Sequence, residues 1–453
     1  MTNDDLQLIR HLSFVIRISE AALSHGKLVR AVGRWDLTAL AINGLIGAGI
    51  FGLPADAARL TGPWSPLACL LCAAVVLFIV LCFAEVSSLF VGTGGPYLYA
   101  REAFGDPLGL VAGWMMWLAR ATAFAANINL MISFLGYFTP GARAAPARAV
   151  IIVAVVSFLT AINIRGVRLG ALVGDVLAAT KLAPMFVFVL SGLFFVDRQM
   201  FDLGFRPSRA DFGQAMLLYV FAFTGFEFAA IVAGEALAPR KDLPGAMLTA
   251  LAIATVLYTG IQTVCVGTLP NLADSRTAMA DASARFLGSL GGKVIAATAL
   301  VSIAGNLSGM ALISPRLTYV LGEDGLLPSA LAATHARFRT PYVSILLYGL
   351  VTATLALSGS FVVLVRISAV ARIVPYILTC LSLPVLRRKY PDMRNRFRLK
   401  GGWAIPAVAV ALCTWLLFQS QWKDILAAGI ALAAGFLLYA LSSPLRRKDA
   451  KNR

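Results

Sequence analysis

One stretch of the sequence decides the fold: Asn43-Gly44-Leu45-Ile46-Gly47-Ala48-Gly49-Ile50-Phe51-Gly52, with Pro54 just beyond it. It lies inside an apolar segment, residues 37–60, and a helix that spans a bilayer needs about 20 such residues. Glycine costs about 1 kcal/mol in a helix interior and proline about 3 kcal/mol. Four glycines and a proline at the centre of this segment therefore predict a broken helix.

A second interruption is predicted at Phe221-Ala222-Phe223-Thr224-Gly225-Phe226-Glu227, inside the apolar segment 212–237. Lipid cannot satisfy the freed backbone groups, so a break is tolerated only where it faces protein or a watery cavity. For either break alone, close packing of small residues between helices is an alternative explanation. Breaks in the first and sixth of the apolar segments together predict two inverted five-helix repeats with a substrate site between them.

The composition is that of a membrane protein. Of 453 residues, 59% are hydrophobic and only 13% are charged, whereas a soluble domain is roughly a quarter charged. Twelve apolar segments follow one another, at residues 37–60, 66–91, 107–138, 147–164, 169–196, 212–237, 245–269, 293–321, 341–358, 361–386, 403–420 and 424–443. We therefore expect an all-α integral membrane protein with twelve transmembrane helices and no soluble domain.

The expected organisation follows from these segments. We expect an N-terminal extension (1–30), a first five-helix repeat (31–200), a second, inverted repeat (201–390), two further helices (391–445) and a basic tail (446–453). With a cytoplasmic N-terminus, 24 of the 39 Lys and Arg fall in segments predicted inside and 9 in segments predicted outside. This asymmetry predicts both termini in the cytoplasm and a plasma (inner) membrane location. The net charge of +17 then reports contact with anionic lipid, not with nucleic acid.

No catalytic or metal centre is predicted. The six cysteines are scattered through apolar segments, which is typical of small buried hydrophobes, so we expect no disulfide, no metal and no cofactor. The three histidines fall in loops or in the extension, and no nucleophile–base arrangement is present. The sequence therefore does not predict an enzyme.

The breaks themselves offer a binding chemistry. A half-helix that begins near Gly49 presents free N–H groups and the positive end of its dipole, which suit a carboxylate. Carbonyl groups near Leu45 and near residues 221–224 could accept hydrogen bonds from an ammonium group. Because this chemistry uses the backbone, the candidate binding residues at the breaks are Leu45, Gly47, Ala48, Gly49, Ile50, Phe221, Ala222 and Thr224.

Several motifs resemble those of the amino acid–polyamine–organocation superfamily. In chain order they are Gly47-Ala48-Gly49-Ile50-Phe51, Ala84-Glu85-Val86-Ser87-Ser88, Gly94-Gly95-Pro96-Tyr97-Leu98-Tyr99-Ala100-Arg101, Thr224-Gly225-Phe226-Glu227, Pro239-Arg240-Lys241-Asp242-Leu243-Pro244 and Glu323-Asp324-Gly325-Leu326-Leu327-Pro328. The similarity covers about residues 30–440. It implies the leucine-transporter fold, alternating access and amino-acid-like substrates.

Lys181 is the candidate proton carrier. It lies within the fifth apolar segment, where a lysine is costly unless it is paired or deprotonated. By the same resemblance, proton-coupled bacterial members carry a fifth-helix lysine where sodium-driven relatives bind Na⁺, and Lys181 matches that place. A lysine that snorkels to the cytoplasmic interface is the alternative.

Glu227 lies directly after the second break. It either stabilises that break or joins the proton path.

Resemblance to the arginine–agmatine exchanging branch implies further pocket residues. It places Arg120 and Phe124 at pocket-facing positions of the third segment, and it places Phe221 and Met310 where that branch has gating tryptophans. A cation in the pocket and the loss of a cation–π surface favour a neutral or acidic substrate over a basic one. Pairing of Arg120 with Glu227 or another internal carboxylate is the structural alternative.

Polar residues elsewhere in the spans have separate expected roles. In the tenth segment, Arg372 and Ser368 are candidates to line the pathway, whereas Arg366 is expected to snorkel outward. Glu85 and Arg101 lie near the predicted cytoplasmic side and are expected to make gate or loop contacts.

The expected function is proton-coupled uptake of neutral amino acids, with protons, lipid and the amino acid as partners. An exchanger of amino acids or polyamines with the same fold is the main alternative. A channel or a sensor is the alternative from another class, although a channel needs no paired breaks and a sensor normally carries a soluble output domain. The sequence leaves the oligomeric state open.

Overall fold

The computed structural model of the chain describes residues 33–90, 95–166, 181–202, 204–231, 236–391 and 397–449. The expected N-terminal extension, the first part of the expected fifth span and the last four residues of the expected basic tail lie outside the described residues. The first residues of that tail instead continue the last helix, α17 (Trp422–Asp449).

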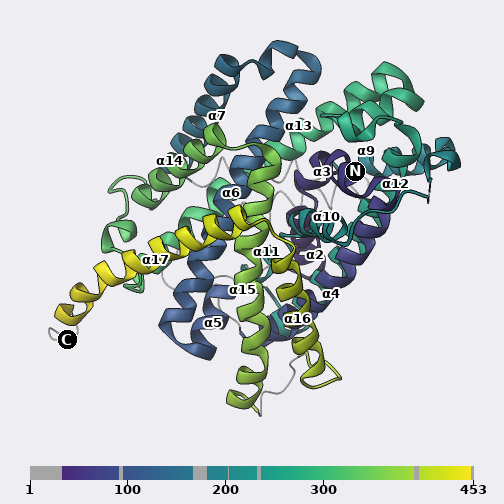
Figure 1. Cartoon of the computed structure of the whole chain (residues 1–453). Helices are drawn as coiled ribbons and strands as arrows, with labels where there is room; N and C mark the ends of the chain where they lie inside the picture. The colour runs from purple at the N-terminus through teal and green to yellow at the C-terminus, as the bar shows by residue number, and fades with distance from the viewer. Residues whose placement is uncertain are drawn as a thin grey trace, which may run out of the picture.

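The described part of the chain is built of helices gathered into one bundle (Figure 1). The first half contains α2 (Arg34–Leu45), α3 (Gly49–Thr61), α4 (Ser65–Leu89), α5 (Pro96–Phe104), α6 (Asp106–Phe138), α7 (Ala145–Arg165) and α9 (Leu182–Gly192). The second half contains α10 (Arg209–Ala222), α11 (Phe228–Ile231), α12 (Pro239–Thr268), α13 (Ala278–Glu323), α14 (Tyr342–Ser358), α15 (Phe361–Lys389) and α16 (Ala404–Phe418), followed by α17.

Each of the twelve expected apolar segments carries helix. Among the described residues, seven stretches are long and apolar enough to cross a membrane: Gly49–Leu89, Asp106–Phe138, Ala145–Arg165, Arg240–Thr268, Ala278–Glu323, Phe361–Lys389 and Trp422–Ala440. Three shorter apolar helices lie at Leu182–Phe195, Tyr342–Ser358 and Ala404–Phe418. An all-helical, multi-pass architecture is therefore confirmed, whereas the count of twelve crossings and the inverted repeat stay predictions.

The expected eighth span, from residue 293, lies in the second part of α13. A shorter helical part precedes it, because α13 begins at Ala278 and kinks at Gly288, where φ is +70°. Asp281 holds the first turn, because the hydroxyls of Ser275 and Thr277 donate to its carboxylate at 2.5 and 3.2 Å. Apolar length alone misses this amphipathic first part of the helix.

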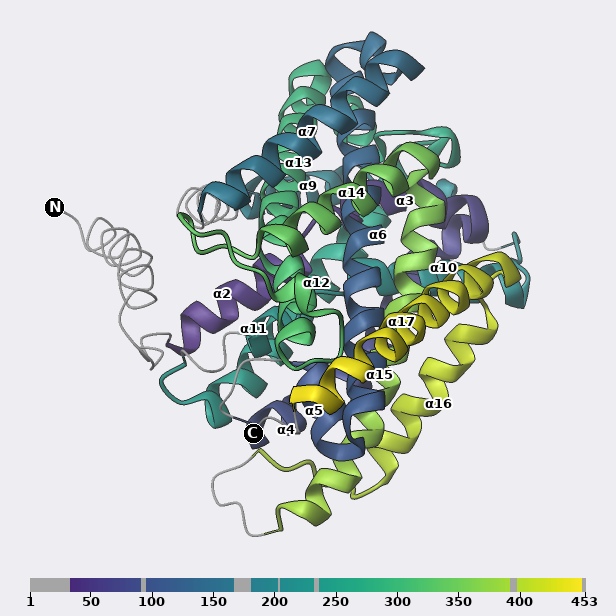
Figure 2. The same ribbon diagram turned by 90° about the vertical axis from the view of Figure 1, so that its left-hand side faces the viewer.

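Helix α6 lies at the centre of the bundle, packed against α13 and α15 (Figures 1 and 2). It is rich in alanine, which allows helices to approach closely in a membrane. By contrast, α7 and α17 lie at the periphery and expose large apolar side chains, including Val150, Phe158, Ile430 and Leu437. These exposed side chains form the surface that lipid would contact.

Both predicted breaks are present, and they touch each other. Helix α2 ends at Leu45 and α3 begins at Gly49, while α10 ends at Ala222 and α11 begins at Phe228. A Cβ atom on Gly44 would lie 2.4 Å from the carbonyl oxygen of Gly225, and one on Gly225 would lie 2.2 Å from that of Gly44. Gly225 also has a φ of +110°, which side chains rarely allow. The close crossing of the two breaks therefore requires glycine in both segments, at positions 44 and 225.

We expect Gly44→Ala and Gly225→Ala each to lower thermal stability strongly, because the added methyl group meets backbone that cannot move aside. Gly429→Ala in α17 is the matched control, since a Cβ there meets nothing within 4 Å. The measurement is the unfolding temperature of the purified protein. Wild-type stability in either break variant would contradict the close crossing.

Candidate functional site

The first break exposes the N-terminus of α3. Within the described chain, no hydrogen-bond partner reaches the amide N–H groups of Ala48, Gly49 and Ile50, whereas Phe51 N donates to Ala48 O at 3.1 Å. These are the orphan donors of a helix start, and the helix dipole adds positive potential beside them. The break therefore presents an anion-binding backbone surface.

One carbonyl expected to be free at this break is occupied. Leu45 O accepts hydrogen bonds from Gly47 N at 2.8 Å and from the Tyr258 hydroxyl at 2.6 Å. Because α12 brings Tyr258 against the end of α2, an ammonium group bound near Leu45 would need a neighbouring carbonyl. In the described residues the neighbouring carbonyl of Ile46 accepts no hydrogen bond.

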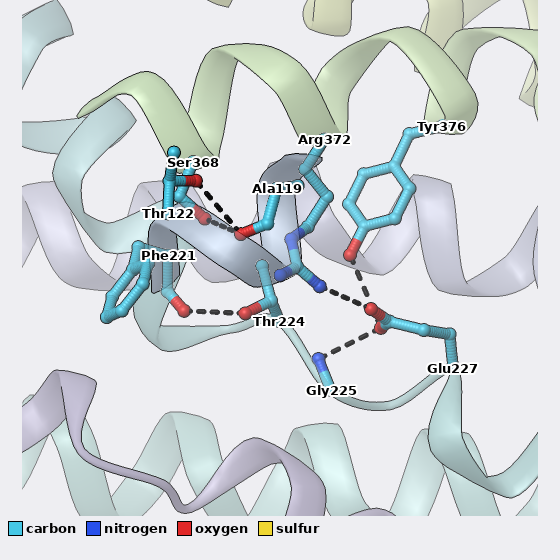
Figure 3. Close-up of polar contacts among 9 residues, drawn as sticks. All are labelled: Ala119, Thr122, Phe221, Thr224, Gly225, Glu227, Ser368, Arg372 and Tyr376. Carbon is cyan, nitrogen blue, oxygen red and sulfur yellow. Dashed lines mark hydrogen bonds and ion pairs between the residues drawn. The ribbon is translucent and has the colours of Figure 1, made fainter. Parts of the chain in front are cut away.

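The second break is held by its own side chains (Figure 3). The Thr224 hydroxyl donates to Phe221 O at 2.8 Å, and Gly225 N donates to Glu227 Oε2 at 2.9 Å. Phe221 O is thereby occupied, while no hydrogen bond in the described chain reaches Ala222 O. Ile46 O and Ala222 O are therefore two acceptors at the breaks that these hydrogen bonds leave available.

Glu227 is fully buried and carries an ion pair with α15. The Arg372 guanidinium donates to Glu227 Oε1 at 2.5 Å, and the Tyr376 hydroxyl donates to Oε2 at 3.4 Å (Figure 3). With the bond from Gly225, the carboxylate accepts from three groups. Glu227 thus fastens the second break to α15.

The alternative that Arg120 pairs with Glu227 is wrong, because Arg372 occupies that carboxylate. Arg120 is 4% exposed, and its guanidinium lies 5.4 Å from the ring centroid of Phe228. Its Nε atom is buried without a hydrogen-bond partner, and the described residues place no carboxylate within ion-pair distance of it. A buried cation without a carboxylate partner faces the site.

Lys181 is 2% exposed and lies at the N-terminal end of α9. Its Nζ atom donates to Asn43 Oδ1 at 2.6 Å and to Asn43 O at 3.2 Å. Asn43 is in the last turn of α2, so the lysine is directed to the first break and does not snorkel to an interface. The snorkelling alternative is wrong for that reason.

A cavity lies between the two breaks, α6 and α13. Its lining contains nine of the expected binding residues: Leu45, Gly47, Ala48, Gly49, Arg120, Phe221, Ala222, Thr224 and Met310. About 30 Å³ of it is open to the centre of a water molecule, and one water needs roughly 10–15 Å³ on that measure. The cavity therefore suits a small ligand or one that displaces a flexible side chain.

Three expected binding residues lie outside this cavity. Ile50 is fully buried in the packing of α3, and Phe124 lines a separate small space beside Tyr348. The Ser368 hydroxyl donates to Ala119 O at 2.7 Å (Figure 3), so it joins α15 to α6. The sequence prediction for these three residues is not supported by their positions.

Sequence reasoning missed other lining residues. These are Gly44, Ala123, Asn127, Gly225, Phe228 and Asn306, while Arg372 was expected on the pathway and does line the cavity. A signal for Asn127 was present, because Arg120, Ala123 and Asn127 have the spacing of one helix face.

Three other charged residues that the sequence singled out form ion pairs. Arg366 forms an ion pair with the buried Asp424 at 2.9 Å, so the expectation that it snorkels is wrong. Glu85 accepts from Arg387 through both carboxylate oxygens at 2.7 Å, and Arg101 pairs with Asp324 at 2.7 Å. These last contacts join helices at the predicted cytoplasmic end.

Glu102, on the short helix α5 outside the spans, makes a further contact at that end. It accepts hydrogen bonds from Lys389 at 2.5 Å and from Tyr390 at 2.7 Å. These hydrogen bonds hold the pKa of the Glu102 carboxyl below its usual range. The carboxylate is exposed enough that we expect its contribution to stability to be small.

Comparison with known proteins extends over nearly the whole chain. The family model described as amino acid permease matches residues 32–443. The chain is 26% identical to the methylthioribose transporter of Bacillus subtilis (strain 168), over 92% of this chain and 94% of the relative. It is 26% identical to the branched-chain amino acid permease BcaP of the same organism, over 94% of each. It is 27% identical to that organism's serine/threonine exchanger SteT, over 90% of this chain and 95% of the relative.

Proposed function

The chain belongs to the amino acid permease family, and we propose that it is a secondary active transporter that couples the uptake of neutral amino acids to protons by alternating access. As a member of this family it is a multi-pass membrane protein and a permease, not an enzyme. The proposal includes an inner (plasma) membrane location with both termini in the cytoplasm. One observation carries it: two broken helices meet at a small buried cavity with unoccupied backbone groups.

The breaks supply the groups that an amino acid needs. The N–H groups of Ala48 and Gly49, which line the cavity, would bind the α-carboxylate, aided by the dipole of α3. The carbonyls of Ile46 and Ala222 would accept hydrogen bonds from the α-ammonium group. Because these are backbone groups, they recognise the part that all amino acids share, and side chains around the cavity provide selectivity.

The charge of the cavity supports a neutral substrate. Arg372 is neutralised by Glu227, so Arg120 leaves one uncompensated positive charge at the site. That charge opposes a second cation on the substrate and is compatible with the carboxylate of a neutral amino acid. Two of the three relatives support the same class, since they are named for branched-chain amino acids and for serine and threonine, whereas the third is named for methylthioribose.

We expect Arg120→Ala to weaken the discrimination against basic substrates, because it removes the uncompensated charge. The measurement is a thermal-shift screen of the purified wild-type and variant proteins against the amino acids and common polyamines at two pH values. Wild-type protein should be stabilised by neutral amino acids by mass action. Arginine that outcompetes both alanine and glutamate on the wild-type protein would contradict the proposed substrate class.

Exchange is the second candidate function, and the likeness to a protein named as a serine/threonine exchanger favours testing it. Proteoliposomes loaded with unlabelled substrate distinguish the two. A proton-coupled symporter should accumulate labelled amino acid into empty vesicles when the outside is acidic. An obligate exchanger should take up label only into vesicles that contain substrate.

A further inference from the structure

Two buried amides face each other across the cavity. Asn127 on α6 and Asn306 on α13 both line it, and the Nδ2 group of Asn127 donates to Asn306 Oδ1 at 2.8 Å. The same Nδ2 group lies 3.7 Å from the sulfur of Met310. Buried amides inside membrane spans are expensive unless they are satisfied, so a pair that borders the cavity is a candidate for recognition.

The pair has an unused hydrogen-bonding group. Asn127 is 2% exposed, and its Oδ1 atom is buried with no hydrogen-bond partner in the described chain. The side chain of Asn306 packs against the first break, since a Cβ atom added to Gly47 would lie 2.7 Å from Asn306 Nδ2. Asn127, which carries this unused group, therefore lines the same cavity as the backbone groups that would bind an amino acid.

A hydroxyl group suits this arrangement. It both donates and accepts hydrogen bonds, so it can satisfy the free group of Asn127 in either orientation of that amide. An apolar side chain of the same size would expel water and leave the amide unsatisfied, which is disfavoured in a buried site. The limited volume of the cavity restricts the side chain to a small one.

We propose that Asn127, held by Asn306, selects small neutral amino acids whose side chains carry a hydroxyl group. This inference rests on the proposed transport function and narrows its substrate class. A site that hydrogen-bonds a substrate hydroxyl rejects the analogue that lacks it far more strongly than a hydrophobic pocket rejects a missing methyl group.

The test compares threonine with valine, which have the same shape and differ by a hydroxyl group in place of a methyl group. Dissociation constants of both are measured on the purified full-length protein by isothermal titration calorimetry. We expect wild-type protein to bind threonine at least about tenfold more tightly than valine. In Asn127→Leu, which keeps a similar volume, the ratio should fall to about one, with valine binding preserved or improved.

Two further variants test whether the change in the threonine-to-valine ratio comes from the Asn127–Asn306 pair and not from the loss of any buried amide. Asn306→Leu should reduce the same ratio, because Asn127 loses the partner that orients it. Asn163→Leu is the matched control, since this buried amide on α7 donates to Leu159 O at 2.8 Å and lies outside the cavity. Its ratio should equal that of the wild-type protein.

The outcomes separate this inference from the proposed function. Equal binding of threonine and valine to wild-type protein overturns the inference, while the binding itself leaves amino acid transport supported. A wild-type preference that survives in Asn127→Leu also overturns it. Failure of every amino acid to bind or to be transported rejects the proposed function, and the inference with it. The wild-type ratio alone decides the case if a variant does not fold.

Discussion

Replacing Lys181 with alanine should abolish uptake driven by an acidic exterior while substrate binding persists. In proteoliposomes, wild-type uptake of labelled amino acid should rise as the outside pH falls below the inside pH. The Lys181→Ala protein should show a flat response at the level without a gradient. Binding, measured by thermal shift, should stay within about tenfold of wild type, because Lys181 does not line the cavity.

The expected loss follows from what Lys181 contacts. Its ammonium group donates to both the side chain and the backbone carbonyl of Asn43, in the last turn of α2. A positive charge is favourable at the C-terminal end of a helix, so protonation holds α2 in this position beside the break. Loss of the proton weakens both hydrogen bonds and frees α2 to move, which would link proton binding to the opening of the site.

Two controls make this result specific. Lys293→Ala removes an exposed lysine of α13 and should leave pH-driven uptake unchanged. Lys181→Arg keeps a positive charge but cannot release its proton, so it should also lose the pH response. Acid-stimulated uptake that survives in Lys181→Ala would end the proposal that this residue carries the proton.

The sequence was sufficient to predict both helix breaks, because glycine and proline act through the backbone and their effect is local. Gly44 and Gly225 show why the breaks belong together, although only the structure reveals that their backbones cross in contact. Leu45 illustrates the limit of local reasoning. Its carbonyl is exposed by the break as predicted, yet a tyrosine 213 residues away in the chain occupies it.

Partners of buried charges could not be predicted, because a pattern of charges along the chain does not say which helices pack together. The sequence suggested Arg120 as a partner of Glu227, and the packing of α10 against α15 brings Arg372 to Glu227 instead. The rotational position of each residue on its helix explains why some residues predicted to line the cavity do not. Arg120, Ala123 and Asn127 share the face of α6 that borders the cavity, while Phe124 is directed to a neighbouring space.

Replacing Glu227 with glutamine should destabilise the protein severely. The variant keeps the volume of the side chain but leaves the guanidinium of Arg372, 3% exposed, without its counter-charge. Removal of one partner from a buried ion pair costs roughly 3–5 kcal/mol of folding stability. The measurement is thermal or chemical unfolding of the purified protein. Glu102→Gln is the matched control, since its partner Lys389 is about half exposed and the loss of a surface pair changes stability little.

A double variant separates the structural role of Glu227 from a role in the proton path. Glu227→Gln combined with Arg372→Met removes both charges of this ion pair, so neither partner is left uncompensated, and the double variant should recover part of the stability that either single variant loses. If Glu227 serves only to hold the second break, any uptake that remains in these variants should still rise as the outside pH falls. A stable Glu227→Gln protein with a flat pH response would instead assign the proton to Glu227. Only that result would make the contact with Arg372 part of the coupling mechanism, because Glu227 would have to leave its ion pair in each transport cycle.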